Sequence, residues 1–118
     1  MATFTIEVEQ KENPRVIIIR TFGYFDESGG IKFREIAQDF IAKGDKFYIL
    51  NLQGSPIVNS IGISGILDIT EQITIDLSGR AVFCGLSNAV AEAFKLVGIT
   101  KLYPVFANET AALAQFSS

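Results

Sequence analysis

The sequence has no histidine and only one cysteine among its 118 residues, and both shortages limit the chemistry it can perform. Without histidine, Ser-His-Asp and Cys-His nucleophiles, histidine-based proton transfer and most zinc or non-haem iron sites are excluded. The single cysteine, Cys84, excludes an intramolecular disulfide and a CxxC redox pair, and its apolar neighbours indicate a buried small hydrophobe. No cluster of carboxylates offers a metal site instead. We therefore expect no metal, no cofactor and no enzymatic activity.

Basic residues are outnumbered, because 10 Lys and Arg face 13 Asp and Glu, which gives a net charge of −3. A nucleic-acid interface needs a clustered basic face, so nucleic acid is not an expected partner. The first residues lack the basic segment and apolar run of a secretory signal. The longest uncharged stretch, 47–67, contains too many polar residues and helix breakers for a membrane-spanning helix. We expect a cytoplasmic chain without direct membrane insertion, folded as one domain over residues 1–118.

Several segments have the hydrophobic patterns of strands. In residues 4–8 apolar and polar side chains alternate, which is typical of a half-buried strand. Residues 16–19 form a continuous β-branched run, the pattern of a strand covered on both faces, and the turn at 11–14 predicts an antiparallel hairpin. Further strands are predicted at 47–50, 81–84 and 102–106, and Pro104 places the last of them at a sheet edge.

The remaining segments have apolar residues at helical spacing, each preceded by a residue that caps helix N-termini. The expected caps are Ser28, Asn59 or Ser60, Ser87 and Asn108. Gly44 and Gly98 suit the ends of the first and third helices, and Val97 is expected to point inward. The apolar stripe of the second helix extends to Leu77. This order predicts one α/β domain with a mixed, mostly parallel sheet of about five strands, an antiparallel N-terminal strand and about four helices.

The loop before the second helix is the most unusual part of the chain. Ligands of open α/β sheets usually bind beyond the carboxyl ends of the strands. Gly62 and Gly65 open the second helix here, although glycine in a helix costs about 1 kcal/mol relative to alanine. Close packing, an anion site at the helix N-terminus and a partner-binding surface each explain them. Asp68, Glu71 and Asp76 on this helix indicate either a solvated face or complementarity to a basic partner.

This same region resembles the central motif of STAS domains, the sulfate transporter and anti-sigma factor antagonist domains. In that motif a strand and a short loop lead to Asp-Ser-Ser-Gly or Asp-Ser-Thr-Gly at the start of a helix. The matching residues are Leu50-Asn51-Leu52 and Val58-Asn59-Ser60-Ile61-Gly62-Ile63-Ser64-Gly65-Ile66-Leu67. Flanking segments also fit, namely 23–26, 79–87 and 97–106, so the resemblance covers nearly the whole chain.

The resemblance implies a protein–protein switch rather than catalysis. In bacterial anti-anti-sigma factors, an anti-sigma factor with kinase activity phosphorylates the Ser or Thr before the motif glycine, and the added charge breaks the complex. Here that position is Ile61, and Asn59 replaces the leading Asp of the motif. Ser60 matches the first Ser of the motif and is the remaining candidate for phosphorylation. Asp26 matches the loop Asp that lies near the phosphorylation site in the family.

We therefore expect a STAS-type interaction module that resembles anti-sigma factor antagonists and lacks the usual serine phospho-switch. Its partner would be a protein such as an anti-sigma factor or GHKL-type kinase, and the oligomeric state is left open. Ile61 either makes an apolar contact with the partner or is tucked beneath the loop. A scaffold or transporter-associated STAS subunit, and a nucleotide or small-anion binder at the helix N-terminus, are the alternatives. The expected partner-binding residues are Asn59, Ser60, Ile61, Gly62, Ser64, Gly65 and Asp26.

Overall fold

The computed structural model describes residues 3–116, which form five strands, five α-helices and one π-helical turn. The fold class predicted from the sequence is confirmed, with one more helix than the four expected. The elements are β1 (Thr5–Lys11), β2 (Val16–Phe22), α1 (Glu27–Ala42), β3 (Phe47–Gly54), α2 (Ser60–Glu71), the π-helical turn η1 (Gln72–Asp76), β4 (Arg80–Cys84), α3 (Asn88–Leu96), α4 (Ile99–Leu102), β5 (Val105–Phe106) and α5 (Glu109–Ala114).

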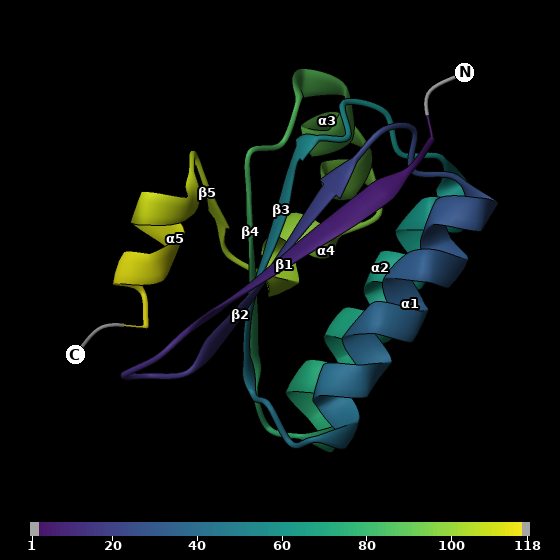
Figure 1. The fold of residues 1–118 in the computed structure, drawn as a ribbon. Coiled ribbons are helices and arrows are strands. Elements are labelled where there is room, and N and C mark those ends of the chain that lie inside the picture. The colour runs from purple at the N-terminus through teal and green to yellow at the C-terminus, as the bar shows by residue number, and fades with distance from the viewer. Residues whose placement is uncertain (1–2, 117–118) are drawn as a thin grey trace.

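The strands lie in one sheet in the order β1-β2-β3-β4-β5. β1 pairs antiparallel with β2, whereas the other three pairs are parallel. Because the strand order never reverses, right-handed crossovers place α1, α2 and α3 on one side of the sheet. Only α5, which follows the last strand, lies on the other side (Figure 1). We refer to these two sides as the helical face and the α5 face.

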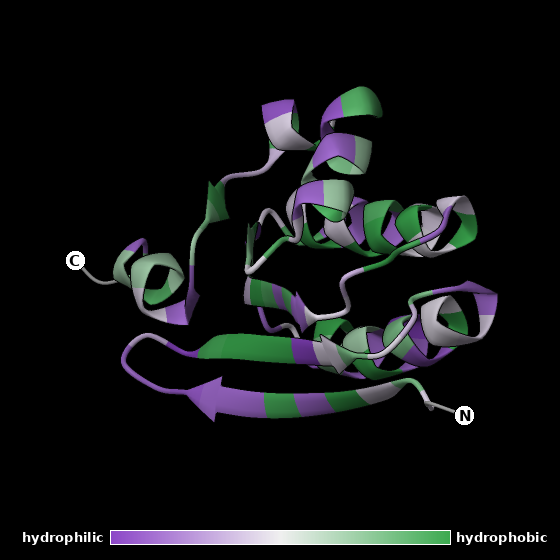
Figure 2. Ribbon diagram, turned by 90° about the horizontal axis from the view of Figure 1, so that it is seen from above, coloured by the Kyte–Doolittle hydropathy of each residue, from purple (hydrophilic) through white to green (hydrophobic). Residues whose placement is uncertain are grey.

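Alternate residues of each strand fill two separate cores. Ile17 and Ile19 of β2 belong to the large core under the helical face, while Val16 and Ile18 pack with Ala112 on the α5 face. Figure 2 shows the resulting difference between β1, where hydrophobic and hydrophilic residues alternate, and β2, which has a continuous hydrophobic stretch. The β-branched run at 16–19 is therefore covered on both faces, as predicted.

The first helix begins earlier than predicted, because Asp26 rather than Ser28 is its N-cap. The Asp26 backbone is extended (φ −110°, ψ −158°), and its carboxylate accepts a hydrogen bond from the Gly29 N–H at 3.1 Å. Ser28 already lies within the first turn. Both residue types cap helices well, so the choice is made by the preceding loop, where the Phe25 N–H donates to the Ile57 carbonyl at 3.0 Å.

The segment after α3 also differs from the prediction, since residues 102–106 are not one strand. Only Val105–Phe106 pair with β4, and residues 99–102 form the short helix α4. Gly98 ends α3 as expected, with a left-handed φ of 84° that suits glycine. This turn moves Val97 away from the apolar stripe, so its side chain is 52% exposed instead of inward. Ile99, which is fully buried, takes that place in the core.

The second helix keeps its apolar stripe but changes its winding. The α-helix ends at Glu71, and the chain continues through the π-helical turn to Asp76. Ile73 within this turn remains fully buried. The apolar stripe predicted toward Leu77 is therefore built from an α-helix followed by a π-helical turn. The angle between successive side chains differs in the two kinds of helix.

Candidate functional site

The start of α2 is fixed by Asn59. Its backbone is extended (φ −84°, ψ 176°), and its side-chain oxygen accepts a hydrogen bond from the Gly62 N–H at 2.8 Å. Its carbonyl accepts from the Ile63 N–H at 2.9 Å. Of the two caps that the sequence offered, Asn59 is the one used, and Ser60 is the first helical residue. An asparagine performs this capping without adding a negative charge to the helix start.

The loop that carries Asp26 lies directly beside the loop that leads into α2. Phe25 and Val58 form a parallel bridge between the two loops. The Phe25 N–H donates to the Ile57 carbonyl, and the Asn59 N–H donates to the Phe25 carbonyl, both at 3.0 Å. The structure therefore brings the Asp26 loop and the Asn59–Gly65 segment together, although they are far apart in the sequence.

Close packing accounts for the glycine at position 62. A Cβ atom there would overlap the carbonyl oxygen and the ring of Phe25, a fully buried side chain. The start of α2 also lies against the start of α1: a Cβ at Gly65 would be 3.5 Å from the Cα of Gly30, an ordinary contact. Gly62 is consequently required by the contact between α2 and the Asp26 loop, whereas position 65 has room for a methyl group.

Ile61 is not tucked beneath the loop. Its side chain is 52% exposed, and Tyr24 and Ile57 of the two adjoining loops are 52% and 58% exposed. Ser60 and Ser64 are exposed on the same first turns, where the Ser64 hydroxyl donates to the Ser60 carbonyl at 3.1 Å. We call these five residues, Tyr24, Ile57, Ser60, Ile61 and Ser64, the α2-start surface. It offers apolar side chains beside small hydroxyl groups.

Of the acidic residues of α2 and η1, Asp68 forms an ion pair with α1, whereas Glu71 and Asp76 do not. Asp68 lies 3.5 Å from the guanidinium of Arg34 on α1, so this ion pair links the two helices. Both side chains are about half exposed, at 42% and 44%, and such pairs contribute little to stability. Glu71 and Asp76 are exposed. The charges on this face are therefore mainly those of a solvated helix pair.

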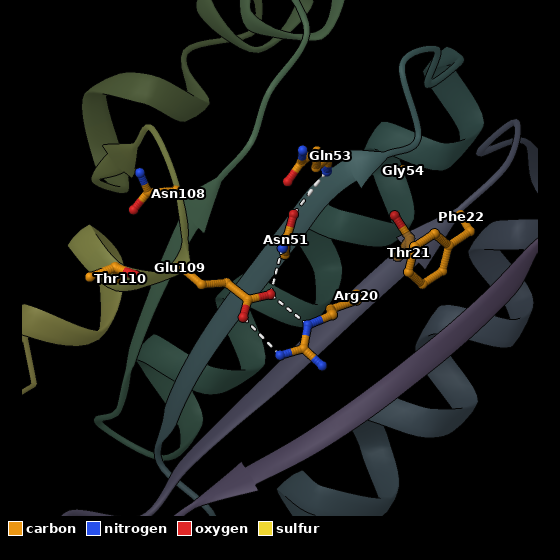
Figure 3. A pocket seen from close by; sticks show the side chains of 9 residues that line it. All are labelled: Arg20, Thr21, Phe22, Asn51, Gln53, Gly54, Asn108, Glu109 and Thr110. Carbon is orange, nitrogen blue, oxygen red and sulfur yellow. Dashed lines mark hydrogen bonds and ion pairs between the residues drawn. The ribbon is translucent and has the colours of Figure 1, made fainter.

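A concave feature, which the sequence did not indicate, lies on the α5 face. It is a pocket of about 660 Å³ at the carboxyl ends of β2 and β3, next to the start of α5 (Figure 3). We call it the polar pocket. Its lining residues are Arg20, Thr21, Phe22, Asn51, Gln53, Gly54, Asn108, Glu109 and Thr110.

An ion-pair network forms the floor of the polar pocket. Glu109 accepts hydrogen bonds from Arg20 Nε (2.5 Å) and Nη2 (2.7 Å) and from Asn51 Nδ2 (2.5 Å) (Figure 3). Arg20 Nη2 also donates to Glu9 at 2.6 Å. The hydrogen bonds from Arg20 hold the pKa of Glu109 below its ordinary value of 4.5, with a further contribution from Asn51, although burial acts in the opposite direction. Hydrogen bonds from Lys11 and then Arg20 lower the pKa of Glu9 to about 2.

Two signals in the sequence could have indicated this pocket. Arg20 directly follows the apolar run 16–19, and Asn51 interrupts the apolar residues of β3. Both continue the alternation that places Ile18 and Ile49 on the α5 face. A charged or amide side chain in such a position requires a partner. That partner, Glu109, is 89 residues from Arg20, so the pairing could not be inferred from local pattern.

Cys84 is buried at the end of β4, as predicted. Burial raises the pKa of its thiol to about 12, and the nearby Glu109 carboxylate acts in the same direction. A thiol with this pKa stays protonated near neutral pH and is a poor nucleophile. Across residues 3–116 the structure shows no group of three or more His, Cys, Asp or Glu placed to hold a metal ion. No helix within that range combines the length and apolar character needed to cross a membrane.

The sequence and the fold of this chain are both similar to those of known proteins. A sequence model of the STAS domain matches residues 7–112. BtrV of Bordetella bronchiseptica, assigned as an anti-sigma factor antagonist, is 28% identical over 78 residues, which are 66% of this chain and 66% of that protein. A Thermotoga maritima structure with the same assignment has a TM-score of 0.85 at 14% identity, covering 93% of this chain and 92% of that one. The phosphorylated form of Bacillus SpoIIAA has a TM-score of 0.72 at 19% identity, covering 92% and 96%.

The two solved structures are similar to this chain in fold. The match to the STAS sequence model adds the family, which similarity in fold alone does not show. STAS proteins of the anti-sigma factor antagonist type are regulatory binding proteins. This agrees with the prediction from the sequence that the chain is not an enzyme.

Proposed function

Because the chain belongs to the STAS domain family, we propose that it binds a regulatory protein partner in the manner of an anti-sigma factor antagonist. The contact is made by Asn59–Gly65 at the start of α2 together with the Asp26 loop. The observation that carries this proposal is the 52% exposure of Ile61 at the junction of two hydrogen-bonded loops. An apolar side chain exposed in that position is suited to the centre of a protein interface.

The partner complex has no usual serine switch. Ile61 occupies the position where the family carries its phosphoacceptor, and an isoleucine side chain cannot accept a phosphoryl group. Ser60 is exposed and adjacent, and it is the candidate for a phosphorylation displaced by one residue. If the partner is an anti-sigma factor or GHKL-type kinase, the complex persists in the presence of ATP unless Ser60 is modified. This interaction takes place in the cytoplasm.

Two alternative functions use the same region. A scaffold or transporter-associated STAS subunit would bind a different protein through the same exposed residues. A nucleotide or small-anion binder would use the main-chain N–H groups at the start of α2. The anion site has less support, because the Asn59 side chain already accepts the Gly62 N–H that an anion would need. The protein-binding proposals are therefore preferred.

The test is the affinity of a partner recovered from the native lysate, measured by calorimetry with two matched variants. Ile61→Asp should weaken binding about 30-fold or more, because an unpaired carboxylate at the centre of an interface costs about 2 kcal/mol or more. Ile75→Asp is the control, since Ile75 is 72% exposed and lies in η1 at the opposite end of α2. Equal affinities of Ile61→Asp and the wild type would contradict the assignment of the α2-start surface.

A further inference from the structure

The polar pocket lies where strands of open α/β sheets present their ligands, at the carboxyl ends of β2 and β3. Its volume of about 660 Å³ is within the range of small-molecule sites. The two strands have a register shift here: Arg20 pairs with Asn51 but Phe22 pairs with Gly54, so β3 carries one extra residue. Such bulges occur next to functional sites, where they redirect side chains.

The charges around the pocket disfavour an ionic ligand. Arg20 lies within 4 Å of three carboxylates, those of Glu7, Glu9 and Glu109. Lys11, which pairs with Glu9 at 2.7 Å, offsets one of these carboxylates, and an anion would meet the negative charge that remains. A cation would lie close to the Arg20 guanidinium, and both oxygens of Glu109 already accept hydrogen bonds. An uncharged ligand avoids both costs.

The hydrogen-bonding groups that remain are mostly amides. Within residues 3–116 the Gln53 side chain makes no hydrogen bond. The bond from Gln53 to Asn51 Oδ1 (2.9 Å) comes from the main-chain N–H of Gln53. Asn51 keeps a second N–H beyond the one that Glu109 accepts, and it is only 9% exposed. Asn108 uses its oxygen to cap α5 and keeps its NH₂ group. Amide groups offer a donor and an acceptor in one plane, which matches another amide-type group.

An aromatic ring completes the lining. Phe22, at the end of β2, is 36% exposed and lies on the wall opposite Asn108 and Thr110 (Figure 3). An exposed phenylalanine beside amide side chains favours a planar ring that can stack on it or meet its edge. We propose that the polar pocket binds an uncharged small molecule that joins a planar ring to an amide-type group. The site is distinct from the α2-start surface and does not depend on the partner-binding function.

The test uses benzamide and benzoate, two probes of the same shape that differ in charge. Titrated into ¹⁵N-labelled protein, benzamide should shift the side-chain amide signals of Gln53, Asn51 and Asn108, with a dissociation constant on the order of 1 mM for a ligand of this size. Benzoate should bind at least about tenfold more weakly, because of the surrounding carboxylates. Cyclohexanecarboxamide, which lacks the planar ring, should bind several-fold more weakly than benzamide.

Variants of exposed glutamines provide the matched controls, since neither change disturbs the core. Gln53→Met, which keeps the side-chain length without the amide, should weaken benzamide binding about tenfold. Gln38→Met on α1, outside the pocket, should leave it unchanged. The proposal is overturned if benzoate binds as well as benzamide, if Gln53→Met binds like the wild type, or if benzamide shifts signals elsewhere and not in the pocket.

Discussion

The helical face and the α5 face of the sheet are built from alternate residues of the same strands, but their apolar surfaces differ in length. On the helical face, Tyr48, Leu50 and Leu52 follow one another along β3, and all three belong to the large core. On the α5 face the corresponding row is Ile49 and then Asn51, so the apolar surface stops halfway along the strand. At the polar end of this row of β3 side chains, α5 does not cover the sheet.

The chain connections explain this difference. Three crossover helices cover the helical face because each parallel strand pair requires one. Among the residues that the structure describes, the α5 face has only the six-residue helix that follows the last strand. A short helix can exclude water from the beginning of the strands but not from their ends. The sequence matches this limit, since Arg20 and Asn51 appear where the cover ends, and the Glu109 carboxylate accepts hydrogen bonds from both.

The largest expected effect compares two phenylalanines, one in each core. Phe83 is fully buried on the helical face, with ring centroids of Phe94 and Tyr103 at 5.1 Å and 6.1 Å. Phe116 is 9% exposed, and packs on Phe47 at 5.3 Å near the end of the described chain. Phe83→Ala should lower the free energy of unfolding by about 4 kcal/mol, and Phe116→Ala by about 2 kcal/mol. Urea denaturation of both variants measures this, and equal losses would show that the two cores are equally important.

The network that ends the apolar row should have a smaller effect. Glu109→Gln removes the negative charge that Arg20 and Asn51 share, and should cost about 1–2 kcal/mol near neutral pH. Asp68→Asn is the matched control, because the Arg34–Asp68 pair is longer and half exposed, and should cost about 0.5 kcal/mol or less. The same denaturation assay compares them. A control loss as large as that of Glu109→Gln would contradict a special role for the network.

The network also predicts how stability depends on pH. The folded state lowers the pKa of Glu109 below 4.5 and that of Glu9 to about 2. A carboxylate whose pKa is lowered by folding stabilises the fold at pH values above its pKa in the unfolded chain, near 4.5. This contribution is lost as the pH falls through the pKa of the folded state. The advantage of the wild type over Glu109→Gln should therefore be constant above about pH 5.5 and shrink below 4.5. Denaturation at a series of pH values tests this, and a pH-independent difference would contradict it.

The smallest expected effect concerns a polar atom on the helical face. The hydroxyl of the fully buried Tyr48 has no hydrogen-bond partner among the described residues. Tyr48→Phe should change the free energy of unfolding by less than about 0.5 kcal/mol or raise it, because a buried unpaired hydroxyl contributes no net stability. Asn51→Leu on the α5 face should instead cost about 1–2 kcal/mol, since it leaves Glu109 and the Gln53 N–H with fewer partners. A loss at Tyr48 as large as that at Asn51 would remove this contrast between the faces.

The sequence predicted most of the fold because its signals are local. Periodicity located the order of strands and helices, and Asn59, Ser87 and Asn108 cap the helices at which they were expected. The failures occurred where neighbouring residues offered equivalent local choices. Asp26 and Ser28 are both good caps, and the apolar segment around Leu102 fits a short helix as well as a strand.

The two site regions differ in the same way. The Asn59–Gly65 segment is contiguous, so its residues could be named from one stretch of sequence. The structure shows that Asp26 lies beside it, as the resemblance implied, and that Ile61 is exposed. The polar pocket draws its residues from β2, β3 and the start of α5. No local pattern joins Arg20 to Glu109, because the pairing depends on how the C-terminal helix crosses the sheet.

The most direct test of the proposed function places a phosphoacceptor at position 61. Ile61→Ser places a hydroxyl at the position where the resemblance to the STAS motif implies the phosphoacceptor, while Ile61→Ala shortens the side chain without one. The measurement is the partner's affinity for the wild type and both variants, with and without ATP. With a kinase partner, we expect ATP to dissociate only the Ile61→Ser complex and to leave the wild-type complex intact unless Ser60 is modified. Loss of the complex of a Ser60→Ala variant, which has no hydroxyl at position 60 or 61, on addition of ATP would contradict a contact that lacks the usual phospho-switch.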